Sequence, residues 1–289
     1  MRAGFIGAGK VGFSLGKYLA VHGIAISGYY SRSGASAREA AEFTQSRYYT
    51  SLAEITRDSD TLFITVPDGA IGEIWDDMRN LPIRDKNICH CSGSIPSTVF
   101  FDAEERGAFR YSVHPLYAVS SKYTSYRELE KACFAIEGSQ EHLEEIRTVF
   151  ETMGNRVTAI DPDCKTLYHA AAVMVSNQLA ALADMGTVLL KKCGFSEEDA
   201  ICALAPLIEG NALAVASRGP VEVLTGPVER GDVQTVRNHL DGLLDFAGEN
   251  EAGRDILTAY EALSRQLIRI AERKHPEKDY QQLEKELGK

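Results

Sequence analysis

The stretch "FIGAGKVG", residues 5–12, places glycines at positions 7, 9 and 12 directly after a short apolar run. The run is typical of a buried strand, and Val11, Leu15 and Leu19 then follow at helical spacing. In a strand–turn–helix unit of this kind, the first glycine permits the turn and the second lets the backbone approach a diphosphate. The third lets the helix pack close to its strand. The motif therefore predicts a dinucleotide-binding turn. Its expected cofactor contacts are Gly7, Ala8, Gly9, Lys10, Val11 and Gly12.

Short apolar runs and helical patterns alternate through the first part of the chain. The apolar runs start near residues 2, 24, 61, 87, 109, 133 and 156, and the helical patterns cover 10–22, 36–46, 68–80, 96–106 and 139–153. Alternation of this kind is typical of a parallel sheet with helices on both faces, whose strands are apolar almost throughout. We therefore expect an α/β dinucleotide-binding domain over residues 1–160.

The pattern becomes wholly helical after Ile160. A helix-start signal, Asp161-Pro162, precedes a proline-free stretch, 163–193, that predicts one helix of about 30 residues. Further helical patterns cover 196–216, 232–246 and 251–273. Residues 161–289 are therefore expected to form an all-helical substrate-binding domain. Because the long helix is rich in Ala, Leu and Val, its surface needs a partner, which predicts a homodimer.

Charge and composition exclude several classes of protein. The net charge of −10 and the pI near 5.3 argue against a nucleic-acid partner, which would need a basic face. The six cysteines lie mostly in apolar runs and do not form a disulfide framework. No signal peptide and no uninterrupted apolar stretch of about 20 residues is found, so a cytoplasmic protein without a membrane segment is expected.

The residues after the second predicted strand indicate which dinucleotide binds. NAD-binding domains place an acid there to bind the ribose 2′-hydroxyl, whereas this chain has Ser31, Arg32 and Ser33. A guanidinium flanked by hydroxyls suits a 2′-phosphate, which a carboxylate would repel. The sequence therefore predicts NADP(H), the alternative being a surface loop that happens to contain arginine.

Two further strand ends should line the same crevice, because ligands of such sheets lie beyond the carboxyl ends of the strands. One strand ends at Val66-Pro67-Asp68 and another at Ser92-Gly93-Ser94, where the small Ser92 and Gly93 would let a nicotinamide approach. Other chemistries lack their motifs. The "CHC" at 89–91 alternates across a strand and suits no metal, and the sequence has no HExxH, no CxxC pair, no hydrolase GxSxG and no P-loop.

Polar residues on the long helix are candidates for the chemistry. His169, Ser176 and Asn177 share one broad face of an otherwise apolar helix, and buried polar groups need partners. They face either the nicotinamide and substrate or another helix, to which they hydrogen-bond.

Two other positions are candidates for substrate binding. His114 closes the strand "FRYSVHPL" and either binds substrate or simply ends the strand. The loop "EVLTGPVERGD" places Thr225, Arg230 and Asp232 between two helices, either in a functional loop or in an ordered connection.

The segments "GFIGAGKVG", "SRS", "CSGS", "SVHPL", "DCKTLYHAAAVMVSN" and "LTGPVERGD" together resemble those of bacterial proteins in which a Rossmann-like domain precedes a domain of the DUF2520 type. The chain is also similar in layout to pyrroline-5-carboxylate reductase, the 3-hydroxyacid dehydrogenases and 6-phosphogluconate dehydrogenase. The resemblance implies a Rossmann NADP-binding domain followed by an all-α domain like that of 6-phosphogluconate dehydrogenase. Some members are atypical ketopantoate reductases, which implies NADPH-dependent reduction of 2-dehydropantoate to pantoate in pantothenate biosynthesis.

One departure from this resemblance affects the proton donor. The 3-hydroxyacid dehydrogenases carry a catalytic lysine one turn before an asparagine, and here Val173 stands one turn before Asn177. His169, or Lys165 one turn earlier, would then donate the proton while Asn177 orients the substrate oxygen. Thr225 and Arg230 would help to hold a substrate carboxylate. The alternatives are another keto acid, a cyclic imine, a deazaflavin partner of the F420 type, or a non-catalytic NADP(H) sensor.

Overall fold

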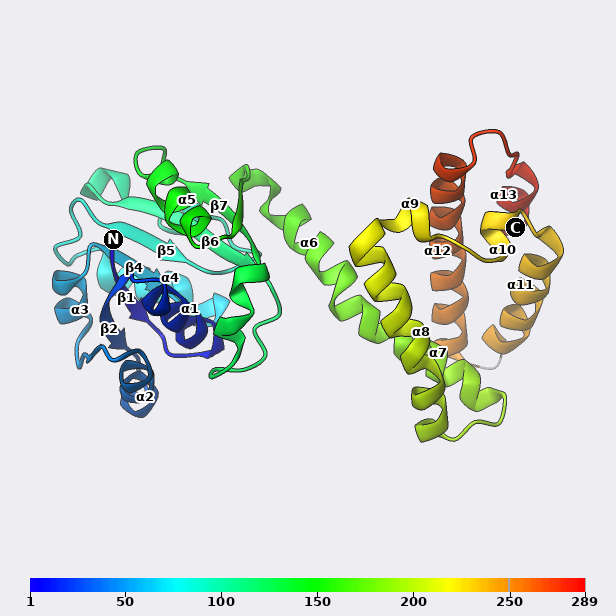
Figure 1. Cartoon of the computed structure of the whole chain (residues 1–289), viewed down its shortest axis with the longest axis horizontal. Coiled ribbons are helices and arrows are strands. Elements are labelled where there is room, and N and C mark those ends of the chain that lie inside the picture. Colours follow the sequence, from blue (N-terminus) through cyan, green and yellow to red (C-terminus); the bar gives the residue numbers. More distant parts are fainter. Residues whose placement is uncertain (249, 289) are drawn as a thin grey trace. The chain divides into compact units, whose positions relative to one another are not determined.

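A computed structural model describes residues 1–248 and 250–288 of the chain. The chain forms two compact units, Met1–Val175 and Ser176–Lys289, and Figure 1 colours the first from blue to green and the second from green to red. The sequence predicts a boundary near residue 160, and the structure divides the chain later. The difference arises because α6 (Lys165–Val175) begins with Lys165, whose side chain is buried inside the first unit.

The first unit is built on an eight-stranded sheet in the order β3-β2-β1-β4-β5-β6-β7-β8. The strands are β1 (Arg2–Ile6), β2 (Ala25–Tyr30), β3 (Arg47–Tyr48), β4 (Thr61–Ile64), β5 (Asn87–His90), β6 (Phe109–Leu116), β7 (Cys133–Gly138) and β8 (Arg156–Ala159). All neighbouring strands run parallel except β6 and β7, which pair antiparallel. The carboxyl ends of β1, β2, β4 and β5 therefore meet at one edge of the sheet, where the sequence predicts the ligand.

Helices cover both faces of this sheet, as the apolar strands predict. The helices of the first unit are α1 (Lys10–Val21), α2 (Gly34–Thr44), α3 (Leu52–Asp58), α4 (Ile71–Met78), α5 (Leu143–Thr152) and α6. On one face Phe5 packs with Phe63 and with Phe13 of α1. On the other face Ile6 packs with Trp75 of α4. Successive residues of β1 thus enter opposite cores, as the two-residue repeat of a strand requires.

The predicted helix over residues 96–106 is wrong. The segment contains two short 3-10 turns, Ser97–Val99 and Glu104–Arg106. The buried carboxylate of Glu137 accepts hydrogen bonds from the backbone N–H of Ser97 at 2.7 Å and from its hydroxyl at 2.6 Å. These two hydrogen bonds hold residue 97 in a 3-10 turn. Because Glu137 is far away in the sequence, the apolar periodicity of residues 96–106 does not predict them.

The second unit is helical throughout its described residues, as predicted. Its helices are α7 (Asn177–Lys192), α8 (Glu197–Arg218), α9 (Pro220–Val223), α10 (Pro227–Arg230), α11 (Val233–Ala247), α12 (Glu251–Lys274) and α13 (Gln281–Leu287). Its core joins α10, α11, α12 and α13 through residues that include Val228, Val236, Ile268 and Leu283. The single helix predicted over 163–193 is divided at Ser176, whose hydroxyl donates to Asn177 Oδ1 at 3.1 Å. Serine and asparagine form such local bonds readily and are weak helix formers.

Two helical segments, Pro162–Lys192 and Glu197–Arg218, are long and apolar enough to cross a membrane by length and composition. Neither segment is an uninterrupted apolar run, since Asp184 interrupts the first and Glu209 the second. Length and composition alone do not indicate a membrane, because helices that pack in water-soluble proteins meet the same test. In the single chain many of their apolar side chains are exposed, including Leu167, Val175, Leu207 and Leu213.

Candidate functional site

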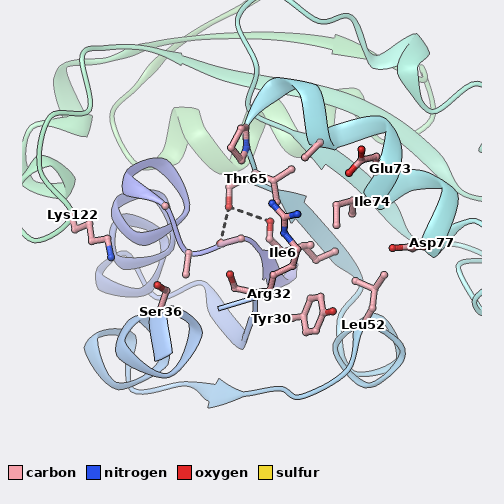
Figure 2. Close-up of a pocket in the computed structure, with 17 residues that line it drawn as sticks. Ile6, Tyr30, Arg32, Ser36, Leu52, Thr65, Glu73, Ile74, Asp77 and Lys122 are labelled. Carbon is pink, nitrogen blue, oxygen red and sulfur yellow. Dashed lines mark hydrogen bonds between the residues drawn. The ribbon is translucent and has the colours of Figure 1, made fainter. Parts of the chain in front are cut away.

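The three glycines of the turn between β1 and α1 have two different roles. A Cβ at Gly7, whose φ is +106°, would lie 2.7 Å from the Thr65 carbonyl oxygen, and a Cβ at Gly12 would lie 2.2 Å from Thr65 Oγ1. A Cβ at Gly9 would have no atom nearer than the Thr65 carbonyl oxygen, at 3.8 Å. Thr65 Oγ1 also donates to the Gly7 carbonyl at 2.9 Å, one of the dashed lines in Figure 2. Gly7 and Gly12 are thus required by the fold, whereas Gly9 leaves open space for a ligand.

The start of α1 is suited to an anion. Gly9 is the N-cap and offers no side-chain acceptor, and the first turn contains no acidic residue. The first N–H groups of a helix have no partner inside the helix, and the helix dipole favours negative charge there. Backbone N–H groups of Lys10 and Val11 are therefore available to a diphosphate, as the sequence predicts.

A cavity of about 410 Å³ opens beside this turn (Figure 2). It is lined by Ile6, Gly7, Ala8, Gly9, Tyr30, Ser31, Arg32, Ser36, Leu52, Thr65, Val66, Pro67, Ala70, Glu73, Ile74, Asp77 and Lys122. Lys122 and Ser36 lie on one side of the cavity in Figure 2, and the carboxylates Glu73 and Asp77 lie on the opposite side. The cavity therefore has a basic and a hydroxyl-bearing side that could hold a phosphate.

Three consecutive residues after β2 were predicted to bind the 2′-phosphate, and the structure separates their roles. Ser31 and Arg32 line the cavity. The Ser33 hydroxyl instead caps α2, accepting from the backbone N–H of Ser36 at 3.4 Å. Ser36, one turn into α2, lines the cavity in its place. The Ser33 hydroxyl thus accepts a hydrogen bond at the helix start, and its predicted contact with the 2′-phosphate stays a prediction.

A second cavity of about 400 Å³ continues from the first toward β5. The two cavities share Gly9, Thr65, Val66 and Pro67, which places the predicted pair Val66-Pro67 at the centre of one groove. The second cavity is also lined by Asp68, Cys91 and Ser92. The groove therefore runs from Arg32 past the glycine turn to Ser92, as an extended dinucleotide would.

The Ser92-Gly93-Ser94 loop at the end of this groove is held by its own hydrogen bonds. The hydroxyls of Ser92 and Ser94 each donate to Asp68 Oδ2 at 2.9 Å. The backbone N–H of Ser92 donates to Nδ1 of His90 at 3.2 Å, and burial lowers the pKa of His90 to about 3. His90 therefore stays neutral and supports the loop as an acceptor.

Lys165 supports the same loop from inside the unit. Its Nζ donates to the Ser92 carbonyl at 2.9 Å and to Ser112 Oγ at 2.7 Å, and its side chain is 1% exposed. Burial lowers the pKa of Lys165. The ammonium is thus directed at two protein acceptors, which suits a positioning role better than the reserve role of proton donor.

Two imidazoles lie against Gly93. A Cβ placed on Gly93 would lie 2.8 Å from Cδ2 of His169 and 2.9 Å from Nε2 of His114, so only a glycine fits between them. His114 Nδ1 lies 2.6 Å from the Tyr168 hydroxyl. Burial lowers the pKa of His114 to about 4 and raises the pKa of Tyr168 to about 12, so both are neutral at neutral pH. The structure thus brings together His114, His169 and Ser92 as predicted, and it adds Tyr168.

The predicted residues of the second unit lie in two places. Ser176 and Asn177 are at the start of α7, both exposed. Thr225 precedes α10 and Arg230 is its last residue; both are exposed, and Arg230 Nη2 lies 3.9 Å from Asp232 Oδ2. Their part in a shared site with the first unit stays a prediction.

The segment around α10 is firmly anchored. Lys274 Nζ donates to the Leu224 carbonyl at 2.6 Å, His275 lies 2.6 Å from a Glu229 carboxylate oxygen, and Val228 is buried. Asp232 caps α11 by accepting from the backbone N–H of Thr235. The geometry of this loop therefore depends on its other residues, and the side chains of Thr225 and Arg230 stay exposed.

Among the residues of the groove and its end that sequence reasoning missed are Ser36, Lys122 and Tyr168. Ser36 lies within a few residues of predicted contacts, and Tyr168 precedes His169, so their neighbourhood was a usable signal. Lys122 lies in a segment of "YAVSSKYTSY" that carries no motif.

Comparison with known families accounts for most of the chain. Residues 1–115 match the family described as a Rossmann-like domain, and residues 132–267 match DUF2520, a domain of unknown function. Both parts of the resemblance noted in the sequence are thereby confirmed. No curated protein matches the chain.

Solved structures share the fold over nearly the full length. Protein TM1727 from Thermotoga maritima is 25% identical, with a TM-score of 0.75, and the match covers 94% of this chain and 99% of that one. BF3122 from Bacteroides fragilis, named as a candidate NADP oxidoreductase, is 28% identical, with a TM-score of 0.72 and coverage of 93% and 98%. A reductive aminase from Aspergillus terreus, in complex with NADPH and ethyl-5-oxohexanoate, is similar in fold at 16% identity, with a TM-score of 0.64 and 93% coverage of both chains.

Proposed function

We propose that this chain is an NADP(H)-dependent oxidoreductase that reduces a small carbonyl compound. The chain joins a match to the Rossmann-like domain with a match to DUF2520. The observation that carries this proposal is the continuous groove from Arg32 to Ser92 past the open position at Gly9. The substrate that we propose is 2-dehydropantoate, which reduction converts to pantoate. We place the reaction in the cytoplasm, where six unpaired cysteines are stable.

The residues of the groove fit NADP(H). The α1 start would bind the diphosphate through backbone N–H groups, and Ser31, Arg32 and Ser36 would bind the 2′-phosphate. Val66, Pro67 and Ser92 would line the nicotinamide half of the groove. The bound cofactor supplies the hydride. The relatives support this choice, since BF3122 is named as a candidate NADP oxidoreductase and the aminase holds NADPH.

Reduction of a carbonyl also requires a proton on its oxygen, and the imidazoles at Gly93 suit this step. His169 would donate the proton, because it reaches the loop beside the nicotinamide half and its side chain is partly exposed. His114 is neutral and hydrogen-bonded to Tyr168, so it would orient the substrate oxygen rather than supply charge. Lys165 would hold the Ser92 carbonyl, and thereby the loop, in place.

For four residues of the second unit we keep the roles that the sequence predicts. Asn177 and Ser176 would contact the substrate oxygen, and Thr225 and Arg230 would bind a carboxylate. A 2-oxo acid needs such a cation, and the guanidinium of Arg230 is 61% exposed. This carboxylate requirement, together with the family resemblance, is why we place 2-dehydropantoate ahead of an imine.

The proposed active form is a homodimer. The exposed apolar side chains of α6, α7 and α8 are more numerous than a chain working alone in water normally leaves uncovered. Light scattering coupled to gel filtration should give twice the 31.7 kDa mass of the chain. A mass of one chain at micromolar concentration would contradict this part of the proposal.

The function is tested by following NADPH absorbance with the purified protein and a panel of substrates. We expect consumption with 2-dehydropantoate and with few other 2-oxo acids. In the His169→Ala variant turnover should fall by about 10²–10⁴-fold, with little change in NADPH affinity. Consumption only with a cyclic imine or a deazaflavin would replace the substrate, and binding without consumption across the panel would indicate a sensor.

A further inference from the structure

Lys122 lines the first cavity although no sequence motif surrounds it. It lies in residues 117–124, which leave β6 and lead to the 3-10 turn Ser125–Arg127; we call these residues the strap. The strap reaches the cavity from a part of the sequence far from Arg32. In Figure 2 Lys122 stands on the same side of the cavity as Ser36.

The strap is held in a defined position. The Ser14 hydroxyl of α1 donates to the Ser121 carbonyl at 3.0 Å, and Ser121 Oγ accepts from the backbone N–H of Tyr123 at 3.2 Å. The Tyr123 ring packs edge-on against Phe13 and Phe43, with centroid distances of 5.3 and 5.7 Å. The backbone of Lys122 is therefore fixed before any ligand binds, which lowers the entropy cost of using its side chain.

The ammonium of Lys122 is held beside the cavity by an acid. Its Nζ lies 3.2 Å from Glu39 Oε2 and 5.3 Å from the centre of the Phe13 ring. Hydrogen bonds from Tyr123 and Lys122 lower the pKa of Glu39, so this carboxylate is charged. Both side chains of the pair are partly exposed, 30% for Lys122 and 39% for Glu39, and such a pair is weak enough to be exchanged for a stronger one.

The charges that line the cavity indicate where it would bind a phosphate group other than the diphosphate at the start of α1. Glu73 and Asp77 stand opposite Lys122 and would repel a phosphate from their side (Figure 2). On the other side Ser36 and Lys122 face the cavity, and Arg32 reaches into it. A phosphomonoester carries up to two negative charges, so two cations bind it better than one.

We infer that Lys122 is a specificity-determining residue, acting with Arg32 as the second cation that binds the 2′-phosphate of NADP(H). In the absence of cofactor Glu39 pairs with Lys122, and the phosphate replaces Glu39 when the cofactor binds. This inference rests on the proposed function, since it requires NADP(H) in the groove.

The test measures the affinities of 2′,5′-ADP and 5′-AMP by calorimetry with the full chain. These two probes differ in the 2′-phosphate and need no catalysis. The Lys122→Met substitution should lower the affinity for 2′,5′-ADP about tenfold and change the affinity for 5′-AMP less than about twofold. The Lys122→Arg variant should retain most of the affinity for 2′,5′-ADP. Glu39→Gln should tighten 2′,5′-ADP about threefold, because it removes the competing carboxylate. The matched control is Lys131→Met, which makes the same charge change at a lysine paired with Glu128 and 72% exposed.

The outcomes separate this inference from the function on which it rests. If the unmodified protein does not prefer 2′,5′-ADP to 5′-AMP, the proposed cofactor itself is wrong. If it does prefer 2′,5′-ADP and Lys122→Met keeps that preference, only the role of Lys122 is wrong. Equal losses of affinity for both probes in Lys122→Met, or a loss of 2′,5′-ADP affinity in Glu39→Gln, would show that the Lys122–Glu39 ion pair only stabilises the strap. Thermal denaturation checks that each variant is folded. If the Lys122→Met protein does not fold, the affinities of the Lys122→Arg and Glu39→Gln variants decide whether Lys122 binds the 2′-phosphate.

Discussion

Substituting alanine at Gly9 should separate ligand binding from folding. The φ and ψ of Gly9 are −76° and −175°, an extended conformation that alanine adopts freely. A Cβ there meets no atom closer than 3.8 Å. Alanine is a poorer N-cap than glycine but loses less backbone entropy on folding, so the free energy of unfolding should change by less than about 1 kcal/mol. The added methyl group stands where the diphosphate approaches, and overpacking of that kind costs about 1–3 kcal/mol, or about 5–150-fold in NADPH affinity.

The Gly12→Ala variant is the matched comparison. Its Cβ would lie 2.2 Å from Thr65 Oγ1 and 2.7 Å from the Gly7 carbonyl oxygen, inside the protein. Here the free energy of unfolding should fall by about 1–3 kcal/mol, less the gain of up to about 1 kcal/mol from alanine in a helix. Urea denaturation and NADPH fluorescence titration measure the two quantities. A Gly9→Ala protein that binds NADPH like the unmodified one would refute the assignment of the turn.

Three further variants and conditions test other parts of the site. Arg32→Ala should weaken NADPH by about 10–100-fold and NADH by less than about twofold, measured by fluorescence titration; equal losses would reassign the cofactor. Lys165→Met should lower kcat/KM by about 10–100-fold, because the Ser92 carbonyl loses its donor and the loop shifts, while calorimetry shows retained NADPH binding; unchanged kinetics would remove Lys165 from the site. The pKa of His114 is lowered to about 4, so its neutral form is favoured by folding. The resulting stability is present above about pH 6.5 and is lost as the pH falls toward 4, by about 3 kcal/mol, a loss that His114→Gln should reduce in pH-dependent urea denaturation. An unchanged pH profile in that variant would show that His114 is not buried in its neutral form.

The first unit was predictable because local pattern and tertiary structure agree there. Strands whose two faces both enter a core are continuous apolar runs, and Phe5 and Ile6 show this directly by packing on opposite faces. The glycine turn was also readable, since steric needs at Gly7 and Gly12 leave few alternatives. The antiparallel direction of β7 was not readable, because apolar alternation carries no information on strand direction.

The site was predictable only where contacts are local in sequence. Ser31 and Arg32 follow their strand directly, whereas Lys122 reaches the same cavity through a strap that the fold alone brings there. Ser33 shows that a hydroxyl beside a predicted ligand can also cap a helix, a second role that the motif does not indicate. Lys165 looked like a candidate donor on a helix, but its two acceptors come from separate places in the fold, Ser92 after β5 and Ser112 within β6.

The most direct measurement is the ratio of dissociation constants for NADH and NADPH with the unmodified protein, obtained by calorimetry in one buffer at physiological salt. An arginine and a lysine on one phosphate should make NADPH bind at least about 100-fold more tightly. Equal affinities, a preference for NADH, or no heat with either nucleotide would contradict the central claim that this groove is built for NADP(H).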